Sequence, residues 1–455
     1  MHQRLADGSR VCIVGGGPAG SFAALHLLHE AGRRGLRVEV LIFEPRDFTR
    51  PGPAGCNRCA GILSARLVAG LESLGLALPA ELVQADVQSY AVHLQGATVR
   101  VERPDPQRRI LSVYRGSGPR HLQGSAPQSF DAFLLAQAAA RGAAVITGRV
   151  KQVAWEDGPV VYAAAPGEAG EARYPADLLV LANGVNSRSP LAPGFGYMPP
   201  LTEVMAQNEV LRPPDWPGDQ VDVFFGQQPG VLFGALIPKG GYLNVSLLGQ
   251  NLHLETVQDF LVAQKLAPPS ATAASATAAS ATAASEQVSA AAHRPGVVHG
   301  GLCGCTPRVA VQPARCFFGD RWVAVGDAAV TRLYKDGIGS AFYTAQAAMQ
   351  VALDRGIMKA DFAGAYAAYC RGIASDNRFG RALFRLWALT LRTPALLDAW
   401  LNAIRGEASL PPGRRVHQRV LWGMFTGAER YRTLFWLAVS PQATAAVLRS
   451  WGRRK

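Results

Sequence analysis

The stretch Val11–Leu28 reads VCIVGGGPAGSFAALHLL, and it determines the expected fold of the chain. An apolar run leads into a turn in which Gly15, Gly17 and Gly20 stand in the order G-x-G-x-x-G, and an amphipathic helix follows. The first glycine permits a tight turn, the second lets the backbone approach a pyrophosphate, and the third allows close packing of helix on strand. The free N–H groups and the dipole at the helix start favour phosphate there. The motif therefore predicts a strand–turn–helix unit that binds a dinucleotide.

The next strand adds to this signal. Arg37–Phe43 is predicted as a strand that completes a β-α-β unit with a parallel sheet, and Glu44 follows it directly. A carboxylate at this place can accept hydrogen bonds from the ribose hydroxyls of an adenosine. A glycine triplet alone is weak evidence, but its position between strand and helix, with an acid after the next strand, makes it specific.

A second motif lies far along the chain, where residues 322–340 read WVAVGDAAVTRLYKDGIGS. A strand is expected to end at Gly326 and Asp327, and a long helix is expected to begin near Gly337. Asp327 is placed to bind a ribityl hydroxyl. The N–H groups of the helix start can face the flavin O2, where negative charge builds up on reduction. This motif favours FAD over NAD as the dinucleotide.

The order of these motifs resembles that of the geranylgeranyl reductase family, within the larger group of flavoproteins shaped like p-hydroxybenzoate hydroxylase. The helical segment 131–143, LLVLANGVNS at 178–187, DGIGSA at 336–341 and GVLFGALIPKGGYLNVSLLG at 230–249 each resemble a family motif. The last of these is similar to the paired strands that line the reductase substrate cavity. The resemblance covers about residues 10–370 and implies non-covalently bound FAD and an oxidoreductase activity.

The motifs and the resemblance together give a set of predicted cofactor-binding residues. These are Gly15, Gly17, Pro18, Ala19, Gly20, Glu44, Asn183, Gly184, Gly326, Asp327, Gly337, Ile338 and Gly339. Asn183 departs from the family, which usually has Asp in this motif, so the electron donor, NADPH or a protein, stays open. The tryptophan-rich motif of flavin halogenases is absent, which argues against halogenation.

Segments with helical spacing, buried strands typical of a parallel sheet and period-two strands typical of an antiparallel sheet alternate along the chain. This alternation predicts an α/β fold with interleaved domains. A Rossmann-type FAD-binding domain is expected to alternate with an antiparallel substrate sheet, followed by a C-terminal helical region. The predicted FAD-binding parts are 1–83, 131–195 and 305–370, the substrate sheet is 84–130 and 196–304, and the tail is 371–455. A repeat of the pentad SATAA marks a low-complexity insert at 268–292, which cannot form a packed core.

Two cysteine pairs stand out among the seven cysteines: a C-x-x-C formed by Cys56 and Cys59, and a C-x-C formed by Cys303 and Cys305. The resemblance implies that both pairs lie near the flavin. Three interpretations remain open. The four thiolates could bind a metal or an iron–sulfur cluster, although C-x-C is a poor match to zinc spacing. A redox disulfide could exchange electrons with the flavin. The pairs could instead be unlinked, and only line the pocket.

Candidate catalytic residues are Cys56, Cys59, Tyr334 and Lys335. The last two stand just before the DGIGS turn, where either can supply a proton to a substrate that receives a hydride. Their alternative role is ordinary cavity lining. Asp336 is expected to cap the helix that follows.

The tail from Arg371 onward has an unusual composition. It contains 15 Arg or Lys residues against four Asp or Glu, a net charge of +11 out of +13 for the chain, and five of the eight tryptophans. Breaks are expected at Pro394, Pro411–Pro412 and Pro441. This composition is typical of helices that lie in a membrane interface. The alternative is a helical bundle packed on the body with a cationic outer face.

Taken together, the sequence predicts an FAD-dependent reductase or dehydrogenase that acts on an apolar, isoprenoid- or quinone-type molecule at a membrane face. A flavin monooxygenase and an electron-relay flavoprotein with a cysteine-bound cluster are the alternatives. No run of 18 apolar residues and no cleavable signal are found. A cytoplasmic protein, peripheral on the inner face of the membrane and without a nucleic-acid partner, is therefore expected.

Overall fold

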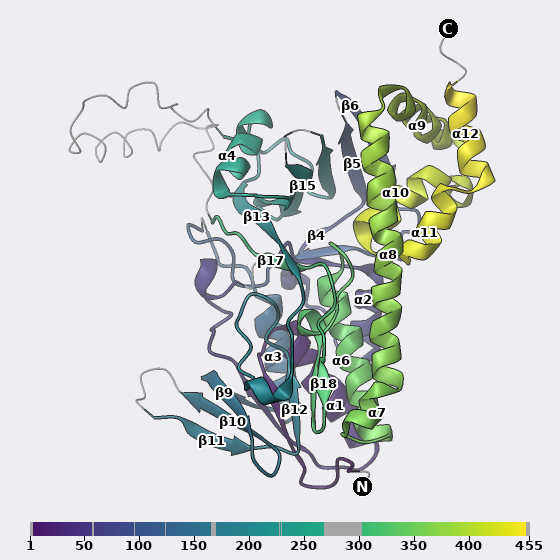
Figure 1. The fold of residues 1–455 in the computed structure, drawn as a ribbon. Coiled ribbons are helices and arrows are strands. Elements are labelled where there is room, and N and C mark those ends of the chain that lie inside the picture. The colour runs from purple at the N-terminus through teal and green to yellow at the C-terminus, as the bar shows by residue number, and fades with distance from the viewer. Residues whose placement is uncertain are drawn as a thin grey trace, which may run out of the picture.

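The computed structural model describes residues 3–56, 59–94, 96–122, 124–164, 170–226, 228, 230–267 and 303–451. The predicted low-complexity insert at 268–292 lies outside these residues. The described chain forms two larger sheets with helices packed against them and a helical C-terminal region (Figure 1). This is the predicted α/β class.

The first sheet has six strands and contains the glycine motif. In spatial order its strands are β18 (Phe318–Gly319), β19 (Trp322–Ala324), β12 (Leu178–Leu181), β1 (Arg10–Val14), β2 (Glu39–Phe43) and β8 (Ala144–Ile146). β1 runs parallel to both of its neighbours, β2 and β12. Val11, Cys12 and Ile13 have no exposed surface, which is the pattern of a central parallel strand covered on both faces.

Helices cover one face of this sheet and a small sheet covers the other. The helices are α1 (Pro18–Arg33), α3 (Phe130–Ala140) and α6 (Gly337–Asp354), and the small sheet consists of β9 (Arg149–Trp155), β10 (Pro159–Ala164) and β11 (Ala172–Pro175). The short helices α2 (Ala65–Ser73) and α7 (Lys359–Ala363) flank α6. Gly15 has φ +105°, and a Cβ there would lie 2.6 Å from the Ala182 carbonyl oxygen. A Cβ on Gly20 would lie 1.8 Å from the carbonyl oxygen of Gly15, so α1 can approach the turn only with glycine at this position.

The second sheet has seven strands drawn from three separate parts of the sequence. In spatial order they are β17 (Arg308–Ala310), β13 (Thr202–Leu211), β16 (Tyr242–Gly249), β15 (Val231–Lys239), β14 (Gln220–Phe225), β5 (Ser89–Leu94) and β6 (Ala97–Glu102). All neighbouring pairs are antiparallel except β14 and β5. A three-stranded sheet of β3 (Ile62–Leu63), β7 (Leu111–Val113) and β4 (Val83–Asp86) lies beside it. Helix α4 (Leu254–Ala263) packs on one face of the seven-stranded sheet.

The C-terminal tail packs on the other face of the seven-stranded sheet. Its helices are α8 (Ala365–Arg392), α9 (Pro394–Gly406), α10 (Val416–Thr426), α11 (Tyr431–Ala438) and α12 (Pro441–Trp451). As predicted, prolines separate them: α9 and α12 begin at proline. Figure 1 shows α8 running along the body, with α9 to α12 gathered beside β5 and β6.

Three tail tryptophans belong to the hydrophobic core that the tail shares with the seven-stranded sheet. Trp387, Trp400 and Trp422 are each at most 7% exposed. Trp387 meets Phe225 of β14 edge-on at 5.6 Å, and Trp422 meets Tyr90 of β5 at 5.4 Å between ring centroids. These rings bury apolar surface that an isolated tail would expose to water. The tail is therefore a helical bundle packed on the body of the protein, and whether its outer face meets a membrane stays a prediction.

Candidate functional site

The structure gathers residues from all three predicted nucleotide motifs around one cavity of about 580 Å³. The predicted cofactor residues that line it are Gly15, Gly17, Pro18, Ala19, Glu44, Asn183, Gly184, Asp327, Gly337 and Ile338. Gly20, Gly326 and Gly339 lie behind this surface. A Cβ on Gly326 would lie 2.7 Å from the Ala19 Cβ, so glycine there lets two motifs approach each other.

Two observations show that this surface fits a dinucleotide. Helix α1 begins at Gly17 without a side-chain cap and without an acidic residue in its first turn, which leaves N–H groups for a pyrophosphate. The Oδ1 atom of Asn183 is buried and has no hydrogen-bond partner among the described residues. A buried amide oxygen of this kind calls for a donor, and FAD offers hydroxyl and N–H donors.

Glu44 and Asp327 place two carboxylates in the cavity wall. Glu44 is 5% exposed, and it accepts hydrogen bonds from the backbone N–H groups of Gly16 and Arg46, both at 2.9 Å. Burial raises the pKa of Glu44 and that of Asp327, while the nearby Arg115 opposes the shift at Asp327. Each ionised carboxylate keeps lone pairs free to accept ribose or ribityl hydroxyls.

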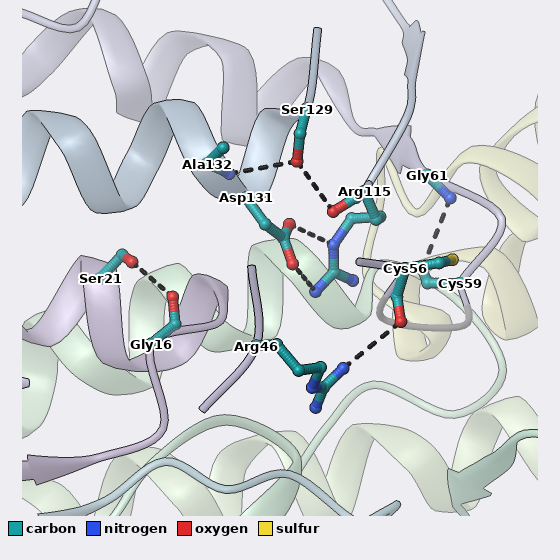
Figure 2. A network of polar contacts seen from close by, with 10 residues as sticks. All are labelled: Gly16, Ser21, Arg46, Cys56, Cys59, Gly61, Arg115, Ser129, Asp131 and Ala132. Atoms are coloured by element: carbon teal, nitrogen blue, oxygen red, sulfur yellow. Dashed lines mark hydrogen bonds and ion pairs between the residues drawn. The ribbon is translucent and has the colours of Figure 1, made fainter. Parts of the chain in front are cut away.

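Arg115 is a cavity residue that the sequence reasoning missed. Its guanidinium makes a two-pronged ion pair with the fully buried Asp131 at the start of α3 (Figure 2). Burial disfavours the charged guanidinium, but Asp131 and the thiol of Cys59 outweigh this effect, so the pKa of Arg115 is raised. The guanidinium of Arg115 therefore stays protonated at the cavity wall, with its charge balanced by Asp131. No spacing rule connects Arg115 to Asp131, because the partners meet only through the packing of α3.

The loop before α6 carries the candidate proton donors. Tyr334 and Asp336 both have positive φ values, 61° and 54°, which costs backbone strain for residues with a Cβ. The Tyr334 hydroxyl donates to Glu203 at 2.9 Å, and burial together with this bond raises the pKa of Tyr334. The Lys335 ammonium lies 4.4 Å from the ring centre of Phe233, and burial lowers the pKa of Lys335 to about 8.

The tail holds this loop in place. Arg332 donates to the carbonyl oxygens of Gly427 and Glu429, and its guanidinium stacks on the ring of Tyr431 at 4.0 Å. The backbone N–H of Leu333 donates to a buried asparagine of α8 at 2.9 Å. Asp336 is the N-cap residue of α6 as expected, although it makes no side-chain cap hydrogen bond. Burial raises the pKa of Asp336 to about 6.

The two cysteine pairs have different surroundings. Cys56 and Cys59 line the cavity, whereas Cys303 and Cys305 do not. Cys305 is fixed by paired backbone hydrogen bonds to Gln207 of β13. No disulfide joins any of the seven cysteines, all of which the structure describes, and the described residues contain no group of His, Cys, Asp and Glu that could hold a metal ion. The four-thiolate centre, one of the three interpretations left open, is therefore not formed among the described residues, where the C-x-C segment pairs with β13.

The fold and the cavity define an FAD-dependent oxidoreductase. The sequence matches the family described as FAD binding domain over residues 9–340, and the chain belongs to this family. FAD is accordingly its cofactor, as predicted.

Relatives and solved structures are consistent with this assignment. Protein FixC of Salmonella typhi is 34% identical over 179 residues, which cover 38% of this chain and 36% of FixC. The chain thus matches about a third of the length of this curated relative. A flavoprotein/dehydrogenase from Cytophaga hutchinsonii superposes with a TM-score of 0.62 at 16% identity, covering 98% of this chain and all of the other. A geranylgeranyl bacteriochlorophyll reductase-like protein from Thermoplasma acidophilum gives a TM-score of 0.53 at 17% identity, covering 99% and 97%. The chain therefore has the fold of the p-hydroxybenzoate hydroxylase-like flavoproteins.

Proposed function

We propose that this flavoprotein is a reductase or dehydrogenase for an apolar, isoprenoid- or quinone-type molecule that it takes up at a membrane face. One observation carries the substrate class: the nucleotide cleft continues into an apolar chamber. Its floor is the seven-stranded sheet and its roof is α10. The lining side chains are Tyr90, Val221, Val223, Phe233, Ala235, Ile237 and Phe425, all at most 5% exposed. An apolar molecule gains free energy by entering such a chamber, whereas a polar one loses its hydration.

The chain's own groups hold the cofactor and supply a proton. The bound flavin supplies two-electron hydride chemistry. The glycine turn, Glu44 and Asp327 bind and orient it. Lys335, at the boundary between cleft and chamber, carries a proton at neutral pH and can release it, since its pKa is lowered to about 8. Tyr334 keeps its proton bound to Glu203, so it orients the loop and is not the donor.

The uptake of an apolar substrate is proposed to occur where the tail meets an anionic membrane surface. Arg371, Arg378, Arg385 and Arg392 recur at every seventh residue of α8, and all four are exposed. This spacing keeps them on one side of the helix, as a ridge about 32 Å long. None of the four forms an ion pair with a described residue. Among the helices that the structure describes, none is long and apolar enough to cross a bilayer.

Exposed apolar side chains accompany the arginine ridge. Trp436 and Trp451 are 57% and 43% exposed, and Leu448 is 68% exposed. Tryptophan prefers the boundary between head groups and acyl chains, while arginine prefers anionic head groups. Both chemistries on one bundle favour a lipid surface over a soluble acidic protein.

The substrate class is tested with two apolar probes, decylubiquinone and geranylgeraniol, added to anaerobically reduced holoprotein. We expect one of them to reoxidise the flavin. Ala235→Trp fills the chamber and should lower that rate at least about tenfold, while reoxidation by the polar oxidant ferricyanide stays unchanged. Glu102→Trp adds an indole at an exposed position of the same sheet and should behave as wild type. If neither probe is reduced faster than background, the substrate class is wrong. Oxygen-dependent hydroxylation of a probe would favour the monooxygenase instead.

The membrane face is tested by sedimentation with vesicles of phosphatidylglycerol and of phosphatidylcholine. Each arginine near an anionic surface contributes about 1 kcal/mol. The double variant Arg378→Gln/Arg385→Gln should therefore weaken binding to phosphatidylglycerol about 30-fold. Added salt should reduce the difference by screening. Arg100→Gln/Lys151→Gln removes the same charge from exposed positions on other elements and is the control. If both double variants weakened binding to phosphatidylglycerol equally, binding would depend on net charge alone, and the α8 arginines would not be the contact surface.

A further inference from the structure

The C-x-x-C pair lies in the wall of the cofactor cavity, and the proposed function gives it no task. Cys56 and Cys59 both line the cavity, and both side chains are partly exposed. The Cys59 sulfur accepts a hydrogen bond from the backbone N–H of Gly61 at 3.5 Å. Figure 2 shows both cysteines beside the Arg115–Asp131 pair.

Cationic side chains surround this pair. The Arg115 guanidinium lies near the thiol of Cys59. Arg46 donates to the carbonyl oxygen of Cys56 at 3.4 Å (Figure 2). Lys239, which is 2% exposed, approaches from β15, so that a Cβ on Gly61 would lie 3.1 Å from its Nζ. Each of these cations also has a carboxylate partner: Asp131 for Arg115, Glu44 for Arg46 and Glu209 for Lys239. Partly exposed thiols beside cationic side chains are nevertheless typical of reactive cysteines.

The other cysteines lack this combination of access and surroundings. Burial raises the pKa of Cys12 and that of Cys370 to about 12 each, so both remain inert thiols. Cys316 is exposed but does not line the cavity, and neither do Cys303 and Cys305. Of the seven cysteines, all of which the structure describes, only the C-x-x-C pair borders the cofactor cavity.

We propose that Cys56 and Cys59 are a redox-active dithiol that exchanges electron pairs with the FAD of this protein. In the oxidising direction the two S–H bonds break and one S–S bond forms, releasing two electrons and two protons. Oxidised FAD takes up both electrons and both protons as it is reduced, so the exchange balances. The proposal needs bound FAD but is independent of the apolar substrate and of the membrane face.

The dithiol is tested by anaerobic titration of the oxidised holoprotein with dithionite, followed by flavin absorbance. A disulfide and a flavin that exchange electrons should take up four electrons per flavin, because each is a two-electron couple. Cys59→Ser should take up two, and Cys56→Ser likewise. Cys316→Ser, outside the cavity, should still take up four. Uptake of two electrons by the wild-type protein would overturn the proposal.

A second measurement uses the wild-type protein, so it does not require that a variant folds. The oxidised and the reduced holoproteins are alkylated, digested and mapped by mass spectrometry. In the oxidised protein we expect Cys56 and Cys59 to form a disulfide with each other and therefore to escape alkylation. In the reduced protein we expect both thiols to be alkylated. Complete alkylation of both residues in the oxidised protein, or a disulfide to any other cysteine, would contradict the assignment.

Discussion

Replacing Trp387 by alanine is expected to destabilise the whole protein, because the tail is part of its core. The indole is 5% exposed and lies between Phe225 of the sheet and Trp400 of α9, at 5.6 and 5.7 Å between ring centroids. A buried tryptophan removes about 200 Å² from water, which corresponds to about 5 kcal/mol. Alanine retains part of this, so that a loss of about 3–5 kcal/mol is expected from burial alone.

The indole N–H of Trp387 lowers the expected loss in the free energy of unfolding. The indole N–H of Trp387 is buried and has no hydrogen-bond partner among the described residues. An unsatisfied buried donor costs about 1–3 kcal/mol, and the substitution relieves this cost. The net loss in the free energy of unfolding should therefore be about 2 kcal/mol, the difference between the midpoints of the two ranges.

The assay is urea unfolding of the holoprotein followed by far-UV circular dichroism and by flavin release. Trp436→Ala is the matched control, because Trp436 is 57% exposed on α11 and should change the free energy of unfolding by less than about 0.5 kcal/mol. In the Trp387 variant, flavin release should shift to lower urea together with the loss of helix. If both variants lose the same small amount of unfolding free energy, or if the urea midpoint of flavin release does not change, the tail does not stabilise the FAD-binding body of the protein.

Three further predictions concern the cavity. Gly17→Val should block the approach of the pyrophosphate and give colourless protein, whereas Gly32→Val, at an uncrowded position of the same helix, should keep the flavin absorbance of wild type; a yellow Gly17 variant would contradict the assignment. Lys335→Met should remove the high-pH limb of the rate profile: the ammonium donates below its pKa of about 8, so the wild-type rate falls as pH rises through that value, and identical profiles would exclude this role. Arg115→Met leaves Asp131 buried without its partner and should cost about 3–5 kcal/mol of unfolding free energy, most of it restored by the double variant Arg115→Met/Asp131→Leu; no restoration would mean that the pair is not the cause.

The nucleotide site could be predicted because its requirements are local. Gly15 and Gly20 are dictated by the turn itself, where a Cβ would meet backbone oxygen at 2.6 and 1.8 Å. Asp327 and Gly337 stand at the end of a strand and the start of a helix, and both boundaries can be recognised from the apolar pattern. Parallel strands then bring their carboxyl ends to one edge, which is why these distant motifs share a cavity.

The rest of the site depends on contacts between distant parts of the chain. The meeting of Arg115 with Asp131 depends on how α3 packs, and the apolar chamber depends on α10 covering the sheet. Composition does not distinguish a tryptophan packed against a sheet from an exposed one, so Trp387 and Trp436 looked alike in the sequence. The separation of the C-x-C from the C-x-x-C likewise follows from strand pairing with β13, which no spacing rule predicts.

One side of the tail closes the apolar chamber, and another side carries the arginine ridge proposed to meet a membrane. The contacts between the tail helices connect these two sides. Phe425 at the end of α10 forms part of the chamber roof, and the turn that follows is fixed to the loop before α6 through Arg332. Helices α10 and α11 pack on each other, and α11 packs on α8, which carries the arginine ridge. A force that draws α8 and α11 towards a lipid surface therefore acts on the elements that close the chamber. The proposed apolar substrate needs both a route out of the bilayer and protection from water. One helical bundle that forms the roof and bears the side chains proposed to face the lipid can provide the two together.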